Sequence, residues 1–214
     1  GESVAFVGQS GAGKSTVVSL LSRMYEPTGG EIRANGTPIR EMDIDEWREH
    51  VAVVRQDPFV FDDTLRYNLT IGNRDVDEAE LDRICRIARV DEFIDDLPDG
   101  YETRVGDDGV RLSGGQRQRV ALARALLDDD ADVLVLDEAT SDLDSNLERE
   151  VQRAIEAMSH EYIVVTIAHR LSTVKNADRI YTLEDGRISE AGDHAELIER
   201  DGTYADLYGI QTSR

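Results

Sequence analysis

A glycine-rich loop near the N-terminus constrains the fold of this chain more than any other segment. Residues 8–15 have the pattern Gly-x4-Gly-Lys-Ser, and they follow the apolar, β-prone run 3–7. Residues 15–24 then have a helical pattern. Strand, glycine-rich loop and helix in this order are typical of a phosphate-binding loop, because bare backbone N–H groups and the positive end of a helix face one anion. The sequence therefore predicts a nucleotide site beside a β-sheet.

The expected nucleotide contacts come from one continuous stretch of residues: Gly8, Gln9, Ser10, Gly11, Ala12, Gly13, Lys14, Ser15 and Thr16. Lys14 is expected to reach the β- and γ-phosphates, and the Ser15 hydroxyl is expected to ligate Mg²⁺. The alternative is a glycine-rich turn with an exposed lysine. The flanking strand and helix disfavour that alternative.

Length and composition limit the class of protein. A chain of 214 residues has room for one substantial core with a subdomain. Its single cysteine, Cys85, excludes an internal disulfide, and we expect a small buried side chain on a helix. No apolar run approaches the roughly 20 residues that cross a bilayer, and no signal peptide is recognisable. Because the chain starts directly at a strand without Met, we expect a longer polypeptide around it.

The chain is strongly acidic, with 45 Asp and Glu against 24 Lys and Arg and a net charge of −21. Nucleic-acid binding is not expected, because the phosphate backbone would be repelled. Such a surface resembles that of proteins from salt-loving organisms, in which salt screens the self-repulsion. An ordinary acidic surface is the alternative.

The order of strand-like and helical segments predicts the fold class. Strand-like runs lie at 3–7, 31–34, 51–55, 132–136, 161–167 and 179–184. The stretch between the third and fourth runs is mostly helical in pattern, as residues 77–89 illustrate. This order predicts an α/β fold with a mostly parallel sheet, interrupted by a helical insertion.

Polar residues follow three of the expected strands. Asp137 and Glu138 end an apolar run, Gln56 follows the run 51–55, and His169 follows the run 161–167. Carboxylates at the end of a buried strand indicate that this edge of the sheet faces a site. Each of these residues has a plainer alternative, which is to solvate or cap a strand end or to lie in a polar loop.

A second glycine-rich segment, Ser113-Gly114-Gly115-Gln116, precedes an expected helix over 118–127. It forms a second potential anion-binding helix N-terminus. The plainer alternative is a helix capped by serine. It accounts for the helix but not for the whole pentapeptide that begins at Leu112. Together with the loop at 8–15, this pentapeptide resembles the signature of the ATP-binding cassette (ABC) family.

The resemblance implies a P-loop NTPase, or RecA-like, core over 1–56 and 131–214, and a helical signature subdomain over 57–130. It implies catalytic roles for several side chains. Asp137 would hold Mg²⁺ and Glu138 would be the general base, while Gln56 in the Q-loop would sense the γ-phosphate and ligate Mg²⁺. His169 would contact the γ-phosphate and orient the attacking water, and Lys14 would stabilise the transferring charge.

The resemblance also implies that a second cassette completes the site. In this family two chains bind two ATP molecules head to tail, so Ser113, Gly115 and Gln116 would contact the nucleotide held by the partner. Residues 141–144 match the D-loop between the two sites, with Asp142 where Ala is usual. Asp144 is equally suited to cap the following helix. Both a homodimer and a heterodimer fit these residues.

Further segments resemble exporter-type cassettes: residues 56–69 (the Q-loop and following helix), 103–109 (the X-loop), 192–197 and 202–208. We therefore expect an ATP-binding and ATP-hydrolysing domain of an ABC exporter, joined to transmembrane domains at the cytoplasmic face of the membrane. An importer cassette, a soluble cassette ATPase and a nucleotide-gated module without turnover are the alternatives. Asp107 and Asp108 replace the usual Glu-Arg of the X-loop.

The acidic composition makes a prediction about salt. The Debye length shortens from about 10 Å at 0.1 M salt to about 3 Å at 1 M, so we expect the thermal unfolding midpoint to rise with KCl concentration. NaCl at equal ionic strength should give the same rise. Maximal stability at low salt would contradict a salt-adapted surface.

Overall fold

The structure is a computed structural model that describes residues 1–71, 75–140, 142–158, 162–168 and 170–212. Its strands are β1 (Ser3–Gly8), β2 (Arg33–Ala34), β3 (Thr37–Pro38), β4 (Val51–Val54), β5 (Asp63–Thr64), β6 (Arg104–Val105), β7 (Val133–Asp137), β8 (Ile163–Ile167), β9 (Arg179–Glu184) and β10 (Arg187–Gly192). Its α-helices are α1 (Lys14–Leu21), α2 (Ile44–Glu49), α3 (Leu65–Thr70), α4 (Glu78–Ile87), α5 (Asp91–Ile94), α6 (Gly114–Leu126), α7 (Ser145–Met158), α8 (His194–Glu199) and α9 (Thr203–Thr212). Short 3₁₀ helices lie at η1 (Ile39–Glu41), η2 (Gly100–Glu102) and η3 (Leu171–Thr173).

The main sheet is mostly parallel, and the predicted α/β fold is confirmed. Within the described residues, six strands lie in the order β10-β9-β1-β8-β7-β4. The β1–β8, β1–β9 and β7–β8 pairs are parallel, whereas β10 runs antiparallel to β9. Because Phe6 pairs with Ile167 and Ile167 pairs with Asp137, the carboxyl ends of β1, β8 and β7 meet at one edge. This edge is where ligands of open parallel sheets bind.

The chain divides into two compact units. The first comprises residues 1–53, 131–138 and 159–214, and the second comprises 54–130 and 139–158. The helix α7 thus groups with the second unit, whereas the resemblance assigned its residues to the ATPase core. The boundaries 1–56, 57–130 and 131–214 stay a prediction.

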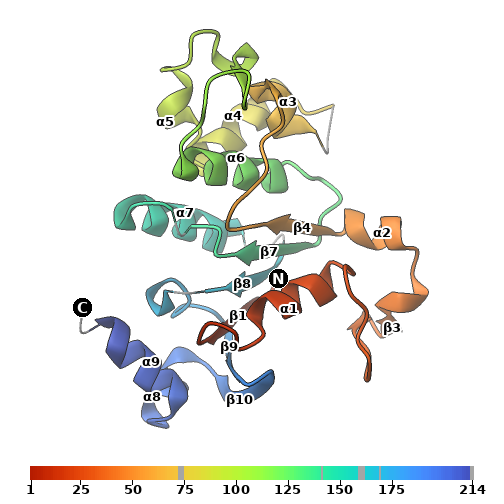
Figure 1. Cartoon of the computed structure of the whole chain (residues 1–214), viewed down its shortest axis with the longest axis vertical. Helices are drawn as coiled ribbons and strands as arrows, with labels where there is room; N and C mark the ends of the chain where they lie inside the picture. The colour runs from red at the N-terminus through yellow and green to blue at the C-terminus, as the bar shows by residue number, and fades with distance from the viewer. Residues whose placement is uncertain (72–74, 141, 159–161, 169, 213–214) are drawn as a thin grey trace. The chain divides into compact units, whose positions relative to one another are not determined.

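In the first unit, successive side chains of β1 point to opposite faces of the sheet, so β1 contributes to a hydrophobic cluster on each face. Ala5 and Val7, each fully buried, belong to a cluster that includes Tyr204 from α9. Phe6 packs against a second cluster, which includes Val18 from α1. Figure 1 shows the same arrangement, with α1 on one side of β1 and the pair α8 and α9 on the other. The strand that precedes the phosphate loop is therefore held from both faces.

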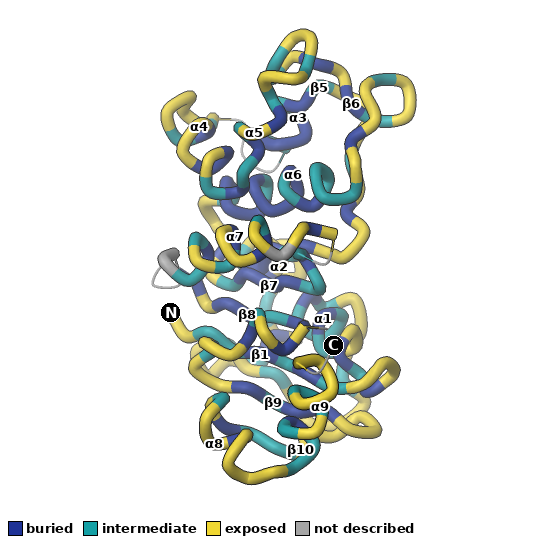
Figure 2. Tube along the Cα trace, turned by 90° about the vertical axis from the view of Figure 1, so that its left-hand side faces the viewer, coloured by how far each residue is buried: buried dark blue, intermediate teal, exposed yellow. Residues whose placement is uncertain are grey.

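The second unit is mainly helical. Helix α6 contacts both α3 and α4, and α4 contacts α5. Figure 2 shows α6 as a largely buried helix, and the buried apolar residues of this unit include Leu65, Ile84 and Val120. The predicted helix over 118–127 begins four residues earlier, because Ser113 caps it. Among the described residues, no helix is both long and apolar enough to cross a bilayer.

The burial of Cys85 makes a prediction about its reactivity. Cys85 is 1% exposed on α4, and burial raises the pKa of its thiol from 9.0 to about 11. Since each pKa unit changes the thiolate fraction tenfold, about a hundredfold less thiolate is present at pH 8 than for a thiol of pKa 9. A disulfide reagent should therefore modify the native chain at least about a hundredfold more slowly than the urea-unfolded chain. Equal rates at pH 8 would contradict the buried thiol.

Candidate nucleotide-binding site

The predicted phosphate loop joins β1 to α1 at the carboxyl edge of the sheet. Gly13 caps α1 in the left-handed region with a φ of 106°, and no side chain caps this helix end. Gly11 also has a positive φ, of 83°. The first N–H groups of a helix have no intrahelical acceptor, and the first turn of α1 carries no acidic residue. The loop can therefore present backbone donors and the positive helix end to an anion.

The β9–β10 hairpin contacts the phosphate loop at two points. The N–H of Gly186 donates to the carbonyl of Ala12 at 3.1 Å. A Cβ on Gly8 would lie 2.4 Å from the backbone oxygen of Leu183 and 3.2 Å from the Cβ of Ala12. Only glycine fits between the end of β1 and this neighbouring strand.

The sequence prediction missed β10 and its contact with the loop. The hairpin turns at Asp185 and Gly186, which have φ values of 48° and 74°. Such a pair of positive φ values is typical of a two-residue hairpin turn, for which Asp-Gly is a preferred sequence. The dipeptide at 185–186 was thus the signal that could have revealed the missing strand.

Lys14 is a buried cation of the first unit. It is 6% exposed, and its Nζ donates to the carbonyls of Gly8 at 2.7 Å and Gln9 at 3.0 Å. Burial lowers the pKa of Lys14, and the charges of Glu138 and Asp137 partly offset this effect. The structure therefore brings together three of the predicted site residues: the loop lysine and both carboxylates at the end of β7.

The two carboxylates follow a strand whose interior is completely buried. Leu134, Val135 and Leu136 are at most 2% exposed, whereas Asp137 and Glu138 are partly exposed. Glu138 has a φ of 51°, and its N–H donates to the carbonyl of Ile167 at 3.1 Å. A left-handed φ is uncommon for a residue other than glycine and is concentrated at functional sites. The backbone thus turns sharply at the second carboxylate.

The donors available for a divalent cation in this unit are few but suited to Mg²⁺. Ser15 is exposed at the first turn of α1, and Asp137 is partly exposed at the end of β7. The described part of the chain contains no group of three or more His, Cys, Asp or Glu side chains placed to hold a metal ion. Mg²⁺ does not need such a group, because it usually takes one or two carboxylates together with substrate phosphates and water.

The second unit contains the signature segment at the N-terminus of α6. The Ser113 hydroxyl accepts from the N–H of Gln116 at 3.2 Å, and the Gln116 side-chain oxygen accepts from the N–H of Ser113 at 2.8 Å. This reciprocal pair is a capping box. It satisfies two backbone donors, and Gly114 and Gly115 begin the helix, whose first turn carries no acidic residue.

The D-loop residues differ in their roles. Asp144 accepts from the N–H groups of Asn146 at 3.0 Å and Leu147 at 3.1 Å, so it caps α7. These backbone hydrogen bonds hold the pKa of Asp144 below its ordinary value. Ser141 and the predicted switch histidine, His169, lie outside the described residues. Gln56 is exposed after β4 in the second unit.

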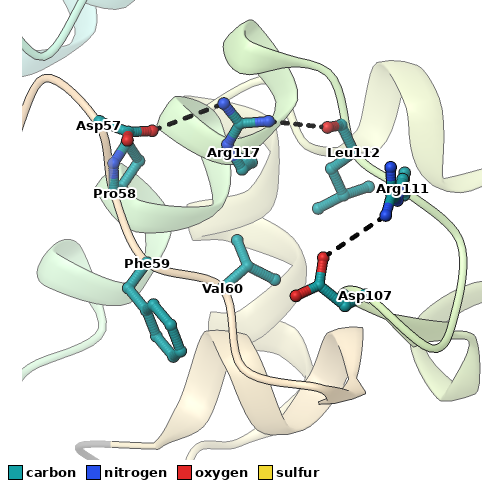
Figure 3. A pocket seen from close by; sticks show the side chains of 9 residues that line it. Asp57, Pro58, Phe59, Val60, Asp107, Arg111, Leu112 and Arg117 are labelled. Atoms are coloured by element: carbon teal, nitrogen blue, oxygen red, sulfur yellow. Dashed lines mark hydrogen bonds and ion pairs between the residues drawn. The ribbon is translucent and has the colours of Figure 1, made fainter.

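A hollow also lies in the second unit, between the Q-loop and the X-loop (Figure 3). It has a volume of about 470 Å³ and is lined by Asp57, Pro58, Phe59, Val60, Gly106, Asp107, Arg111, Leu112 and Arg117. Phe59 is 68% exposed. Asp57 pairs with Arg117 at 3.5 Å, and Asp107 pairs with Arg111 at 3.8 Å. Ion pairs on its rim and an exposed aromatic ring are typical of a docking surface rather than of a closed ligand cavity.

Comparison with known proteins agrees with these features. A model of the ABC transporter family matches residues 1–141. The chain is 48% identical over 213 residues to the ATP-dependent lipid A-core flippase of Saccharophagus degradans, and 50% identical over 214 residues to that of Ralstonia nicotianae. These matches cover 100% and 99% of this chain, but 36% of each flippase. The chain thus spans about a third of the length of these relatives.

A solved structure shows the same fold. The structure of a bacterial Atm1-family ABC exporter with ATP bound superposes with a TM-score of 0.92 at 41% sequence identity. The match covers 98% of this chain and 36% of that chain. The fold and its paired motifs define an α/β ATPase domain of the cassette type. The chain belongs to the ABC transporter family, and the resemblance to exporter-type cassettes is confirmed.

The fit between Gly8 and the β9–β10 hairpin predicts how the loop responds to a methyl group. At Gly11 a Cβ would meet nothing within 4 Å, so Gly11→Ala should cost only backbone strain. Gly8→Ala adds a clash with backbone, and we expect it to lower the free energy of unfolding by about 1–3 kcal/mol more than Gly11→Ala. Urea unfolding of both variants measures the difference. An equal or smaller loss for Gly8→Ala would contradict the close contact with β9.

Proposed function

We propose that this chain is the ATP-binding and ATP-hydrolysing domain of an ABC exporter, acting at the cytoplasmic face of a membrane. ATP hydrolysis is the general activity of this family, and the named relatives are ATP-dependent flippases. The observation that carries the proposal is the position of Lys14. A buried ammonium lies in the phosphate loop, within electrostatic reach of Glu138 and Asp137.

The loop binds the phosphates of ATP. Backbone N–H groups of the loop and the positive end of α1 face the anion. Lys14 exchanges its hydrogen bonds to the carbonyls of Gly8 and Gln9 for bonds to the β- and γ-phosphates. Because the site removes Lys14 from water, each charge–charge contact with phosphate is stronger than it would be at the surface.

Glu138 is the general base in this proposal. It accepts a proton from the water that attacks the γ-phosphorus, while the bond from that phosphorus to the bridging oxygen of ADP breaks. Glu138 directly follows Asp137 at the end of β7, and its backbone is left-handed, with a φ of 51°. His169 contacts the γ-phosphate and orients the water, and Gln56 senses the γ-phosphate. Lys14 stabilises the charge on the transferring phosphoryl group.

Ser15, Asp137 and Gln56 are the proposed ligands of a magnesium ion. When bound, Mg²⁺ would offset the negative charge of the β- and γ-phosphates. Ser15 offers a hydroxyl oxygen at the first turn of α1, and Asp137 offers a carboxylate at the adjoining edge of the sheet. Gln56 offers an amide oxygen.

A second cassette completes the site. Ser113, Gly115 and Gln116 of each copy contact the γ-phosphate of the ATP that the other copy binds, which gives a symmetric, isologous dimer. The capped N-terminus of α6 supports this role, since its bare glycine N–H groups and positive helix end suit an anion. Closure of this dimer by ATP and its reopening after hydrolysis would drive transport.

The transmembrane domains are the second kind of partner. We infer that they dock at the hollow between the Q-loop and the X-loop in Figure 3, where Phe59 is exposed. Asp107 lines this hollow and Asp108 follows it in the chain. These two residues replace the Glu-Arg usual in exporter X-loops and make the X-loop more acidic. A basic segment of the membrane domain is the matching contact.

Substitution of the proposed base tests this function. We expect Glu138→Gln to lower ATP hydrolysis by about 10²–10⁴-fold. It should also leave an ATP-dependent dimer that light scattering detects, because ATP remains bound and uncleaved. Glu199→Gln makes the same charge change at an exposed position of α8, and it should hydrolyse ATP at the native rate.

Two outcomes would contradict the proposal. Native turnover in Glu138→Gln would show that another group is the base. A Glu138→Gln chain that binds ATP with native affinity but stays monomeric at saturating ATP would contradict closure of the dimer by ATP and this domain alone.

A further inference from the structure

Gln118 is a fully buried polar side chain on α6, and none of the sequence motifs gives it a role. It is 1% exposed, and it is among the largest side chains of the described residues that are less than 2% exposed. The other members of that group are aliphatic or, in one case, tyrosine. Burying a carboxamide costs free energy unless both of its ends are hydrogen-bonded. The position of Gln118 therefore needs an explanation.

The two ends of the Gln118 carboxamide bind two different loops. Its Nε2 donates to the backbone carbonyl of Gln56 at 3.1 Å, which lies 62 residues away in the sequence. Its Oε1 accepts from the backbone N–H of Asp142 at 3.1 Å, which lies 24 residues away. One side chain of the signature helix thus joins the Q-loop to the D-loop, and all three residues belong to the second unit.

The D-loop also packs directly on the signature glycines. A Cβ on Gly114 would lie 2.5 Å from Oδ2 of Asp142. A Cβ on Gly115 would lie 3.2 Å from the carbonyl oxygen of Asp142 and 3.3 Å from Cδ2 of Leu143. The backbone of Asp142 is therefore held both by the Gln118 side chain and by the N-terminus of α6.

We propose that Gln118 is a positioning residue that makes the Q-loop, the signature helix and the D-loop respond to nucleotide as one body. The inference rests on the proposed function, in which Gln56 senses the nucleotide of its own chain and Ser113 contacts the nucleotide of the partner. The carboxamide suits this task because it has one donor end and one acceptor end and carries no charge. Movement of the Q-loop backbone is then transmitted to the two segments that face the second copy.

Two substitutions separate the two hydrogen bonds. Gln118→Glu keeps an acceptor for the N–H of Asp142 but loses the donor to the carbonyl of Gln56. Gln118→Met keeps the length of the side chain and loses both hydrogen bonds. Val120→Ala is the matched control, because Val120 is fully buried on the same helix and its truncation lowers stability by leaving a cavity.

The first measurement does not depend on turnover. Amide hydrogen exchange at Asp142, followed by NMR in the whole chain without nucleotide, reports the D-loop bond directly. We expect exchange at Asp142 to be about tenfold faster in Gln118→Met than in Val120→Ala, after correction for global stability. Gln118→Glu should keep the native rate. Equal corrected rates in Gln118→Met and Val120→Ala would overturn the proposal.

The second measurement is the dependence of ATP hydrolysis on ATP concentration. Gln118→Met and Gln118→Glu should both lower kcat about tenfold with KM changed less than about twofold, because the loops are misaligned while the phosphate loop is intact. Val120→Ala should keep both constants within about twofold of native. Native kcat in either Gln118 variant would overturn the coupling. Absence of turnover in the native chain would contradict the proposed function instead, and Asp142 exchange alone would then decide the role of Gln118.

Discussion

The seating of the phosphate loop on the β9–β10 hairpin is the constraint on which the first unit depends. Gly8 lies against the Leu183 carbonyl with no room for a Cβ, and the Gly186 N–H donates to Ala12 on the other side of the loop. These contacts fix where α1 begins, and therefore where Lys14 is buried. The parallel register of β1, β8 and β7 then brings Asp137 and Glu138 to the same edge. The fit of Gly8 thus places the phosphate loop and Lys14, and the strand register places the two carboxylates at the same edge of the sheet.

The second unit also contains a helix N-terminus that suits an anion, but its proposed role differs. The N-terminus of α6, like that of α1, lies in a glycine-rich segment and has no acidic residue in its first turn. Each helix end is suited to an anion, but α1 carries a buried lysine, whereas α6 is tied to the D-loop by the hydrogen bond from the N–H of Asp142 to the Gln118 side chain. In the proposed function, one end binds the ATP of its own chain and the other serves the ATP of a second chain.

Local patterns in the sequence predicted the parts of the site that depend on neighbouring residues. The strand over 3–7, the phosphate loop and the acidic end of β7 were all expected from short segments, and the structure contains them. The sequence did not reveal β10, because its first residues are exposed and carry no clear alternation. Gln118 was missed for another reason. A glutamine on a helix has the composition of a surface residue, and its burial depends on contacts with Gln56 and Asp142 that are remote in sequence.

In the proposed function, each nucleotide site takes its phosphate loop from one chain and its signature from another. Mixing two inactive variants tests it most directly. Lys14→Ala and Ser113→Arg homodimers should each be inactive, but their mixed dimer combines one intact loop with one intact signature. With random pairing at equal concentrations, half of the dimers are mixed and carry one intact site of two, so about a quarter of native ATP hydrolysis should return. No recovery on mixing two variants that each still fold and dimerise would contradict the shared site.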